Sequence, residues 1–312
     1  MMFKKILARF GKGAANVDLR FENRPYTPGE TVDGEISIQG GEVEQNINSL
    51  AVRLMMSVRT SQGTADREVS SIRLNTANRI LPKEQQIVAF SFPLPTNLAI
   101  TRNIVSYYFD TELDIEGGVD RSDVDRLTVD FPANIQNLFR VLSSLGFREK
   151  HESGKLDQYG QEFAFFPTEF LNGSVNEVEF RFAQEENGLY VWMEVDCRNG
   201  FHEIEAKREF FLEEALLLDE QKLTNILKQY LAEASERPHS YSQPFSYSTP
   251  GGYRPRSSNP MGGMIGGLAM GVFGGLLLSE LMGSAVEAMG FDDEMEEVED
   301  FDLGDIFGGD ED

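Results

Sequence analysis

The sequence is poor in the residues from which most catalytic and metal sites are built. Its 312 residues include one cysteine and three histidines, namely Cys197, His151, His202 and His239. A single cysteine excludes an internal disulfide and a zinc site with several cysteines, and three scattered histidines offer few ligands to a catalytic metal. The motifs GxxxxGKS/T, GxSxG and HExxH are absent from the sequence as well. We therefore predict that the chain is not an enzyme and uses no cofactor.

Positive charge is also scarce. Lys and Arg number 28 against 52 Asp and Glu, which gives a net charge of −24. Half of that charge, 12 acidic residues without any Lys or Arg, lies in residues 292–312. Such a surface repels the phosphates of nucleic acids, so we predict that the chain does not bind DNA or RNA.

The N-terminal segment MMFKKILARFGKG lacks the apolar core and the cleavage site of a secretory signal, which favours a cytoplasmic protein. Its apolar residues, Phe3, Ile6, Leu7 and Phe10, share one helical face with lysine and arginine around them. This pattern favours a short helix that packs on its own domain. The alternative is a basic amphipathic anchor on an anionic membrane surface.

Residues 17–131 alternate between apolar and polar side chains, which is the pattern of half-buried β-strands. The longest example places Leu50, Val52, Leu54, Met56 and Val58 on one face. Seven such segments are separated by turns, at 17–21, 32–38, 50–58, 69–74, 88–94, 105–113 and 127–131. Their number and spacing predict that residues 1–131 form an antiparallel β-sandwich.

Pro132 begins a second unit, residues 132–236, in which strands lie between two helices. Ile135, Leu138 and Leu142 fit one face of the first helix, and Asp219 is a plausible cap of the second. Four strands are predicted between them, at 161–166, 178–182, 189–197 and 203–211. Cys197 falls on the apolar face of the third strand, which predicts a small core residue and not a nucleophile. The predicted fold is mainly β, with a second β-rich domain and flanking helices.

The chain changes character after this unit. Residues 237–260 are rich in Pro, Tyr and Ser, which predicts an extended, mobile linker with Tyr241, Tyr247 and Tyr253 as spacer residues. Residues 261–290 are apolar and rich in glycine, and the uncharged stretch 257–279 is long enough to span a bilayer. The glycine spacing would let helices approach closely, so self-association or membrane association is an alternative to a flexible low-complexity segment.

Residues 291–312 form an acidic tail with scattered apolar residues. Such a sequence stays disordered alone, because charge repulsion opposes collapse, but it can fold on a groove with a basic rim. We predict that it is a docking peptide for another protein, through Phe291, Val298, Phe301, Leu303, Ile306 and Phe307. The alternative is a tail that only increases solubility.

Charged residues crowd the loop between the last two predicted strands of the first domain and the strand ends beside it. They are Asp114, Glu116, Asp120, Arg121, Asp123, Asp125 and Arg126. Several carboxylates could bind calcium, but the loop lacks the central Gly and distal Glu of a calcium-binding loop. The two arginines can instead form ion pairs within it. We therefore predict no metal here and interpret these residues as the joint that sets the angle between the two domains.

Five segments carry a resemblance to a known family: FKKILARFGKGAANVDL, YTPGETVDGEISIQGGEVEQNINSLAVRL, YYFDTELDIEGGVDRSDVDRLTV, QEFAFFP and YVWMEVDCRNG. Over residues 2–218 the chain resembles the SpoOM, or sporulation-control, proteins of the arrestin-like superfamily. The resemblance implies a bacterial cytoplasmic regulator with an arrestin-type β-sandwich and a second β-rich domain. Such proteins have been linked to sporulation control, stress and cell-cycle functions through protein contacts.

The predicted function is therefore that of a non-enzymatic adaptor or scaffold that binds other proteins in the regulation of sporulation, stress or the cell cycle. Two alternatives stay open. One is a membrane-associated scaffold that uses the glycine-rich segment, and the other is a β-sandwich that binds a lipid or a sugar.

Overall fold

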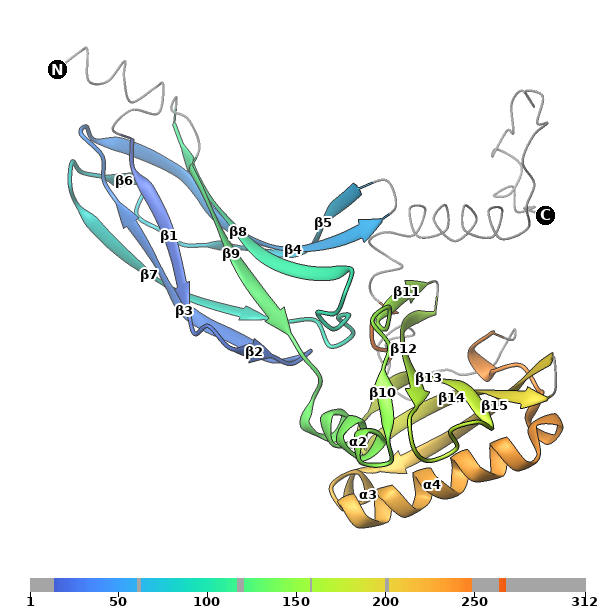
Figure 1. The fold of residues 1–312 in the computed structure, drawn as a ribbon. Helices are drawn as coiled ribbons and strands as arrows, with labels where there is room; N and C mark the ends of the chain where they lie inside the picture. The colour runs from blue at the N-terminus through green and yellow to red at the C-terminus, as the bar shows by residue number, and fades with distance from the viewer. Residues whose placement is uncertain are drawn as a thin grey trace, which may run out of the picture.

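The structure is a computed structural model that describes residues 14–60, 63–116, 121–157, 159–199, 202–248 and 264–267. The described chain is mainly β and forms two domains that lie end to end (Figure 1). The strands of two facing sheets all precede Pro132, and the strands of a third sheet all follow it. The mainly β fold predicted from the alternating pattern is confirmed.

Two sheets make up the first domain. The smaller has the order β1 (Asn16–Phe21), β3 (Thr31–Gln39) and β7 (Gln85–Pro93). The larger has the order β2 (Pro25–Tyr26), β9 (Arg121–Val129), β8 (Val105–Ile115), β4 (Gln45–Thr60) and β5 (Gly63–Leu74), with β6 (Arg79–Ile80) paired to β4. All pairs are antiparallel except β2 with β9.

The core of the first domain lies between these sheets, because every second side chain of a strand points inward. On β4, Leu50 and Leu54 are fully buried, as the alternating pattern predicts. Aromatic rings from both sheets meet at Phe109 of β8, whose ring centroid lies 5.4 Å from that of Phe90 and 5.1 Å from that of Phe92. The seven predicted strands correspond to seven of the nine observed, and the two missed, β2 and β6, have only two residues each.

The second domain has one antiparallel sheet with helices on one face (Figure 1). The sheet has the order β10 (Phe147–Glu149), β12 (Gly160–Pro167), β13 (Val175–Glu185), β14 (Gly188–Asn199) and β15 (His202–Glu213), and β11 (Lys155–Asp157) pairs with β12. The helices are α2 (Ala133–Ser144), α3 (Glu214–Leu217) and α4 (Glu220–Glu236). Asp219 caps α4, since its side chain accepts a hydrogen bond from the Lys222 N–H at 3.1 Å. Cys197 is 2% exposed and is a core residue, as predicted.

Part of the predicted linker 237–260 is instead ordered and packs against the sheet of the second domain. Residues after α4 form two short 3-10 helices, η1 (Pro238–Tyr241) and η2 (Ser246–Ser248). Phe245 is 7% exposed, and the ring of Tyr247 meets that of Trp192 at 5.4 Å between centroids. The prediction of an extended linker is therefore wrong for residues 238–248. Composition cannot reveal that the outer face of the sheet offers Trp192 as a packing partner for these aromatic rings.

Several predictions concern residues outside the described ranges. They are the N-terminal amphipathic helix, the rest of the linker with Tyr253, all but residues 264–267 of the glycine-rich segment, and the acidic docking tail. None of the helices within the described ranges is long and apolar enough to cross a bilayer.

Candidate functional site at the domain joint

The charged β8–β9 hairpin does not form the joint between the domains. The end of β8 and the start of β9 lie at the end of the sandwich far from the second domain, and the chain leaves the first domain at the opposite end of β9 (Figure 1). Because β9 has nine residues, the two ends are about 30 Å apart. The prediction is wrong because a hairpin places its loop and its chain ends at opposite ends of the strands, however close they are in sequence.

The side chains at the start of this hairpin make local contacts. Asp114 accepts a hydrogen bond from the Asn48 side chain at 2.9 Å, and Glu116 accepts one from the Asn46 side chain at 2.6 Å. Asp120 lies outside the described residues. These contacts attach the hairpin to the neighbouring strand β4 within the first domain.

The remaining charged residues of the hairpin lie on β9, where Arg121 is opposite Leu113 and Arg126 is opposite Tyr108. Asp123 joins two sheets, because its carboxylate accepts a hydrogen bond from the Leu19 N–H of β1 at 2.9 Å. Among the residues that the structure describes, no group of three or more His, Cys, Asp or Glu side chains could hold a metal ion.

Asp125 titrates abnormally in this setting. Partial burial, followed by the charge and hydrogen bond of Asp123 and the charge of Asp18, raises the pKa of Asp125 to about 6 from its ordinary value of 3.8. Between about pH 4 and pH 6, Asp125 is therefore protonated in the folded protein but ionised in the unfolded chain. Stability that this group contributes at low pH is lost as the pH rises through that window.

Replacing Asp125 by asparagine should make the protein more stable at pH 7.5 by about 1 kcal/mol, since the amide carries no charge and the side chain is partly screened by water. The gain should shrink towards pH 5, where the wild-type carboxyl is largely protonated. Urea denaturation at the two pH values measures it. Asp33→Asn, at an exposed residue of β3, is the matched control, and as a surface substitution it should change the free energy of unfolding by no more than about 0.5 kcal/mol. An equal effect of Asp125→Asn at both pH values would contradict the assignment.

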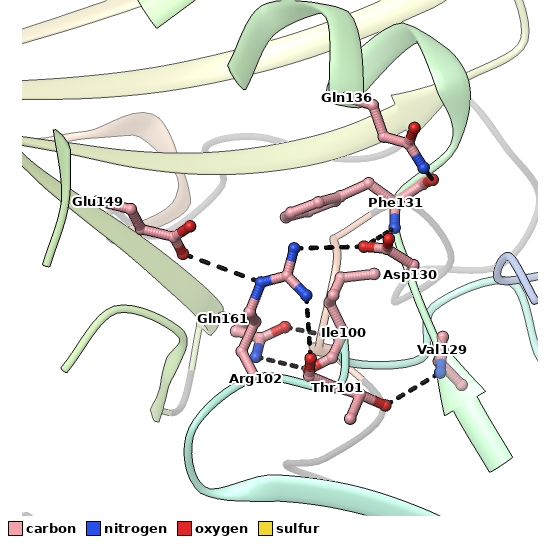
Figure 2. Close-up of polar contacts among 9 residues, drawn as sticks. All are labelled: Ile100, Thr101, Arg102, Val129, Asp130, Phe131, Gln136, Glu149 and Gln161. Atoms are coloured by element: carbon pink, nitrogen blue, oxygen red, sulfur yellow. Dashed lines mark hydrogen bonds and ion pairs between the residues drawn. The ribbon is translucent and has the colours of Figure 1, made fainter. Parts of the chain in front are cut away.

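The observed joint begins with the loop that precedes β8 in the first domain (Figure 2). The Thr101 N–H donates to the Val129 carbonyl at 2.8 Å, and the Thr101 Oγ1 accepts from the Val129 N–H at 2.9 Å. These bonds continue the pairing of β9 up to the residue at which the chain leaves the sandwich. The loop is thereby fixed beside the start of the second domain.

Gln161 of β12 connects this loop to the second domain (Figure 2). Gln161 is 1% exposed, and its side-chain Oε1 accepts a hydrogen bond from the Ile100 N–H at 2.7 Å. Its Nε2 donates to the Ile100 carbonyl at 3.0 Å and to the Gly154 carbonyl at 3.0 Å. One buried amide therefore satisfies three backbone groups, two of them in the other domain, and leaving such groups unpaired would cost free energy.

Arg102, which is partly buried, and Phe131, which is fully buried, belong to the same joint (Figure 2). The Arg102 guanidinium lies 3.3 Å from the Asp130 carboxylate and 3.9 Å from that of Glu149 in the second domain. It also lies over the Phe131 ring, 5.5 Å from the centroid. Phe131 is 1% exposed and packs against Phe139 of α2 at 4.6 Å between centroids. These contacts hold the two domains together and leave the polar groups of the joint paired.

Sequence reasoning missed Ile100, Arg102 and Gln161. Ile100 and Arg102 lie in the loop 94–104, which has no periodic pattern, so the sequence gives no signal for either residue. Gln161 did leave a signal, because it shares the inward face of its strand with Phe163 and Phe165. A polar residue on an apolar face predicts a buried hydrogen-bonding role.

Comparison with known proteins identifies the family. The family model described as SpoOM protein matches residues 3–200. The chain belongs to the SpoOM family. It is 35% identical over 210 residues to the sporulation-control protein spo0M of Bacillus subtilis (strain 168), an alignment that covers 63% of this chain and 81% of that protein.

The fold agrees with this assignment. The crystal structure of Spo0M from Bacillus subtilis matches with a TM-score of 0.59 and 29% sequence identity, over 71% of this chain and 99% of that one. The SpoOM resemblance is thus confirmed, and the two β-rich domains are consistent with an arrestin-like architecture. The joint residues Arg102, Phe131 and Gln161 all lie within the part matched by the family model, whereas residues 264–267 lie beyond it.

Proposed function

We propose that this SpoOM-family chain is a non-enzymatic, cytoplasmic regulatory adaptor that acts through contacts with other proteins in the control of sporulation. The observation that carries the proposal is the match to the Bacillus subtilis sporulation-control protein over both domains. The joint supports it, because the groups that meet there, a buried amide, an aromatic ring and a paired guanidinium, hold two domains together and are not arranged around a reacting atom.

The edges of the sandwich provide surfaces for such contacts. β5 and β7 are edge strands in the described sheets, so their outer backbone groups can pair with an extended peptide. On β7, Ile87 is 53% exposed and lines a surface groove together with Thr76, Gln86 and Val88. The lipid- or sugar-binding alternative has less support, because inward-facing rings such as Phe90 and Phe109 occupy the space between the sheets.

Complementation tests the proposal. The full chain is expressed in a Bacillus subtilis strain that lacks its spo0M gene, and heat-resistant spores are counted against a strain with an empty vector and one with spo0M restored. We expect the chain to shift the spore count towards that of the restored strain. A count equal to that of the empty vector, with the chain present and folded, would contradict a role in sporulation control.

The contribution of the acidic tail is tested in the same strain by proximity labelling. The full chain is compared with one that ends at Gly290, which removes residues 291–312 and keeps η1, η2 and residues 264–267 in the chain. Loss of specific labelled partners from the shorter chain would support a docking role for the tail. Identical partner sets would show that residues 291–312 do not select partners.

A further inference from the structure

Residues 264–267 bind between the two domains, far in sequence from their neighbours. The Ile265 N–H donates to the Phe182 carbonyl of β13 at 3.0 Å, and the Ile265 carbonyl accepts from the Gln161 N–H of β12 at 2.9 Å. The Gly266 N–H donates to the Leu98 carbonyl of the first domain at 3.3 Å. Three backbone hydrogen bonds thus connect one short segment to two strands of the second domain and one loop of the first.

The segment fills a gap in the sheet of the second domain. β12 and β13 pair with each other only over three residues, from Phe165 opposite Val178 to Phe163 opposite Phe180, and the ladder stops at the Phe163–Phe180 pair. Beyond that point Met264 forms an antiparallel bridge with Ala183 of β13, while Gln161 of β12 bonds to Ile265. The inserted residues therefore supply partners to backbone groups of strands that no longer pair directly.

The gap accepts an isoleucine followed by a glycine. Ile265 is 3% exposed and belongs to the main hydrophobic core. Gly266 has a φ of +80°, and a Cβ there would lie 2.8 Å from the Gln161 nitrogen. On the facing side, a Cβ at Gly160 would lie 2.6 Å from the Ile265 carbonyl oxygen. Close approach on both sides requires glycine, so the fit is specific to this segment.

Gln161 links this segment to the joint. Its backbone N–H bonds to Ile265, while its side chain bonds to Ile100 of the first domain. We propose that residues 264–267 are an interdomain clamp, which holds the two domains at one angle and whose release lets them move against each other. The clamp goes beyond the proposed regulatory role and does not depend on it. Because residues 268–312 follow it directly, a partner that pulled on them would change the same equilibrium.

An interdomain distance measurement tests the clamp in the full chain. Spin labels are placed by Ser122→Cys on β9 and Asn225→Cys on α4, both exposed positions, one in each domain. The native Cys197 is 2% exposed and so does not compete for label. With the clamp intact we expect one narrow distance distribution. Ile265→Asp places a charge in an apolar site and should broaden and shift that distribution.

The matched control is Ile87→Asp, the same substitution at a residue that is 53% exposed, and it should keep the narrow distribution. A folded Ile265→Asp protein with the unchanged narrow distribution would overturn the clamp. If that variant does not fold, Gly266→Ala decides, because it adds one methyl group against Gln161 and leaves the charge unaltered. Broadening in Gly266→Ala supports the clamp, and an unchanged distribution overturns it.

Discussion

Gln161→Ala should lower the free energy of unfolding by about 3–5 kcal/mol. The variant removes the partners of three backbone groups, the Ile100 N–H, the Ile100 carbonyl and the Gly154 carbonyl. Gln161 is 1% exposed, so water does not replace the lost bonds without a rearrangement of the joint. Each buried group left unpaired costs about 1–3 kcal/mol, and some relaxation keeps the total below the simple sum. Urea denaturation followed by circular dichroism measures the change.

Gln221→Ala is the control for this substitution, since Gln221 is exposed on α4. Its effect should stay within about 0.5 kcal/mol of the wild type. If Gln161→Ala were no more destabilising than Gln221→Ala, the amide would not be holding the loop of the first domain, and the joint would have to depend on other contacts.

Phe131→Ala should be about as damaging, with a loss of about 3–5 kcal/mol, because it leaves a cavity where a buried ring had been. Phe131 packs against Phe139 at 4.6 Å and against Phe163 at 4.8 Å between centroids, at the point where the chain enters the second domain. The Arg102 guanidinium would also lose the ring beneath it. Calorimetry should show a melting temperature lower by about 10 °C for a protein of this size.

Phe211→Ala is the matched aromatic control, since Phe211 is 39% exposed on β15. A partly exposed ring loses less contact on truncation, so its melting temperature should change by a few degrees at most, about a third of the shift at Phe131. Equal shifts at the two positions would mean that Phe131 is not a central packing residue of the joint.

The strands of the first domain could be read from the sequence because each has one buried and one exposed face. β4 shows this most clearly, with Leu50, Val52 and Leu54 buried and Ala51 and Arg53 partly exposed. The same reasoning fails for β2 and β6, since two residues contain no period. It also fails for η1 and η2, because Tyr241 of η1 packs on the main core and Tyr247 of η2 packs on Trp192, and neither contact follows from their own pattern.

The joint could not be predicted because it depends on contacts between distant residues. Ile100 and Gln161 are 61 positions apart, and no local pattern connects a loop to the first residues of a strand in another domain. The charged hairpin was predicted to form the joint because it precedes the second domain in sequence. The residues that contact that domain instead lie near the other end of β9. Position along the chain was a poor guide to position in space.

The burial of Trp192 gives this protein an optical signal of its own. It is the only tryptophan in the chain, it is 1% exposed, and Tyr247 of η2 covers it. Intrinsic fluorescence excited at the indole therefore reports the second domain alone, because the first domain contributes no tryptophan. Displacement of residues 245–247 would admit water to the indole and move its emission to longer wavelength, so the docking of these residues can be followed without any label.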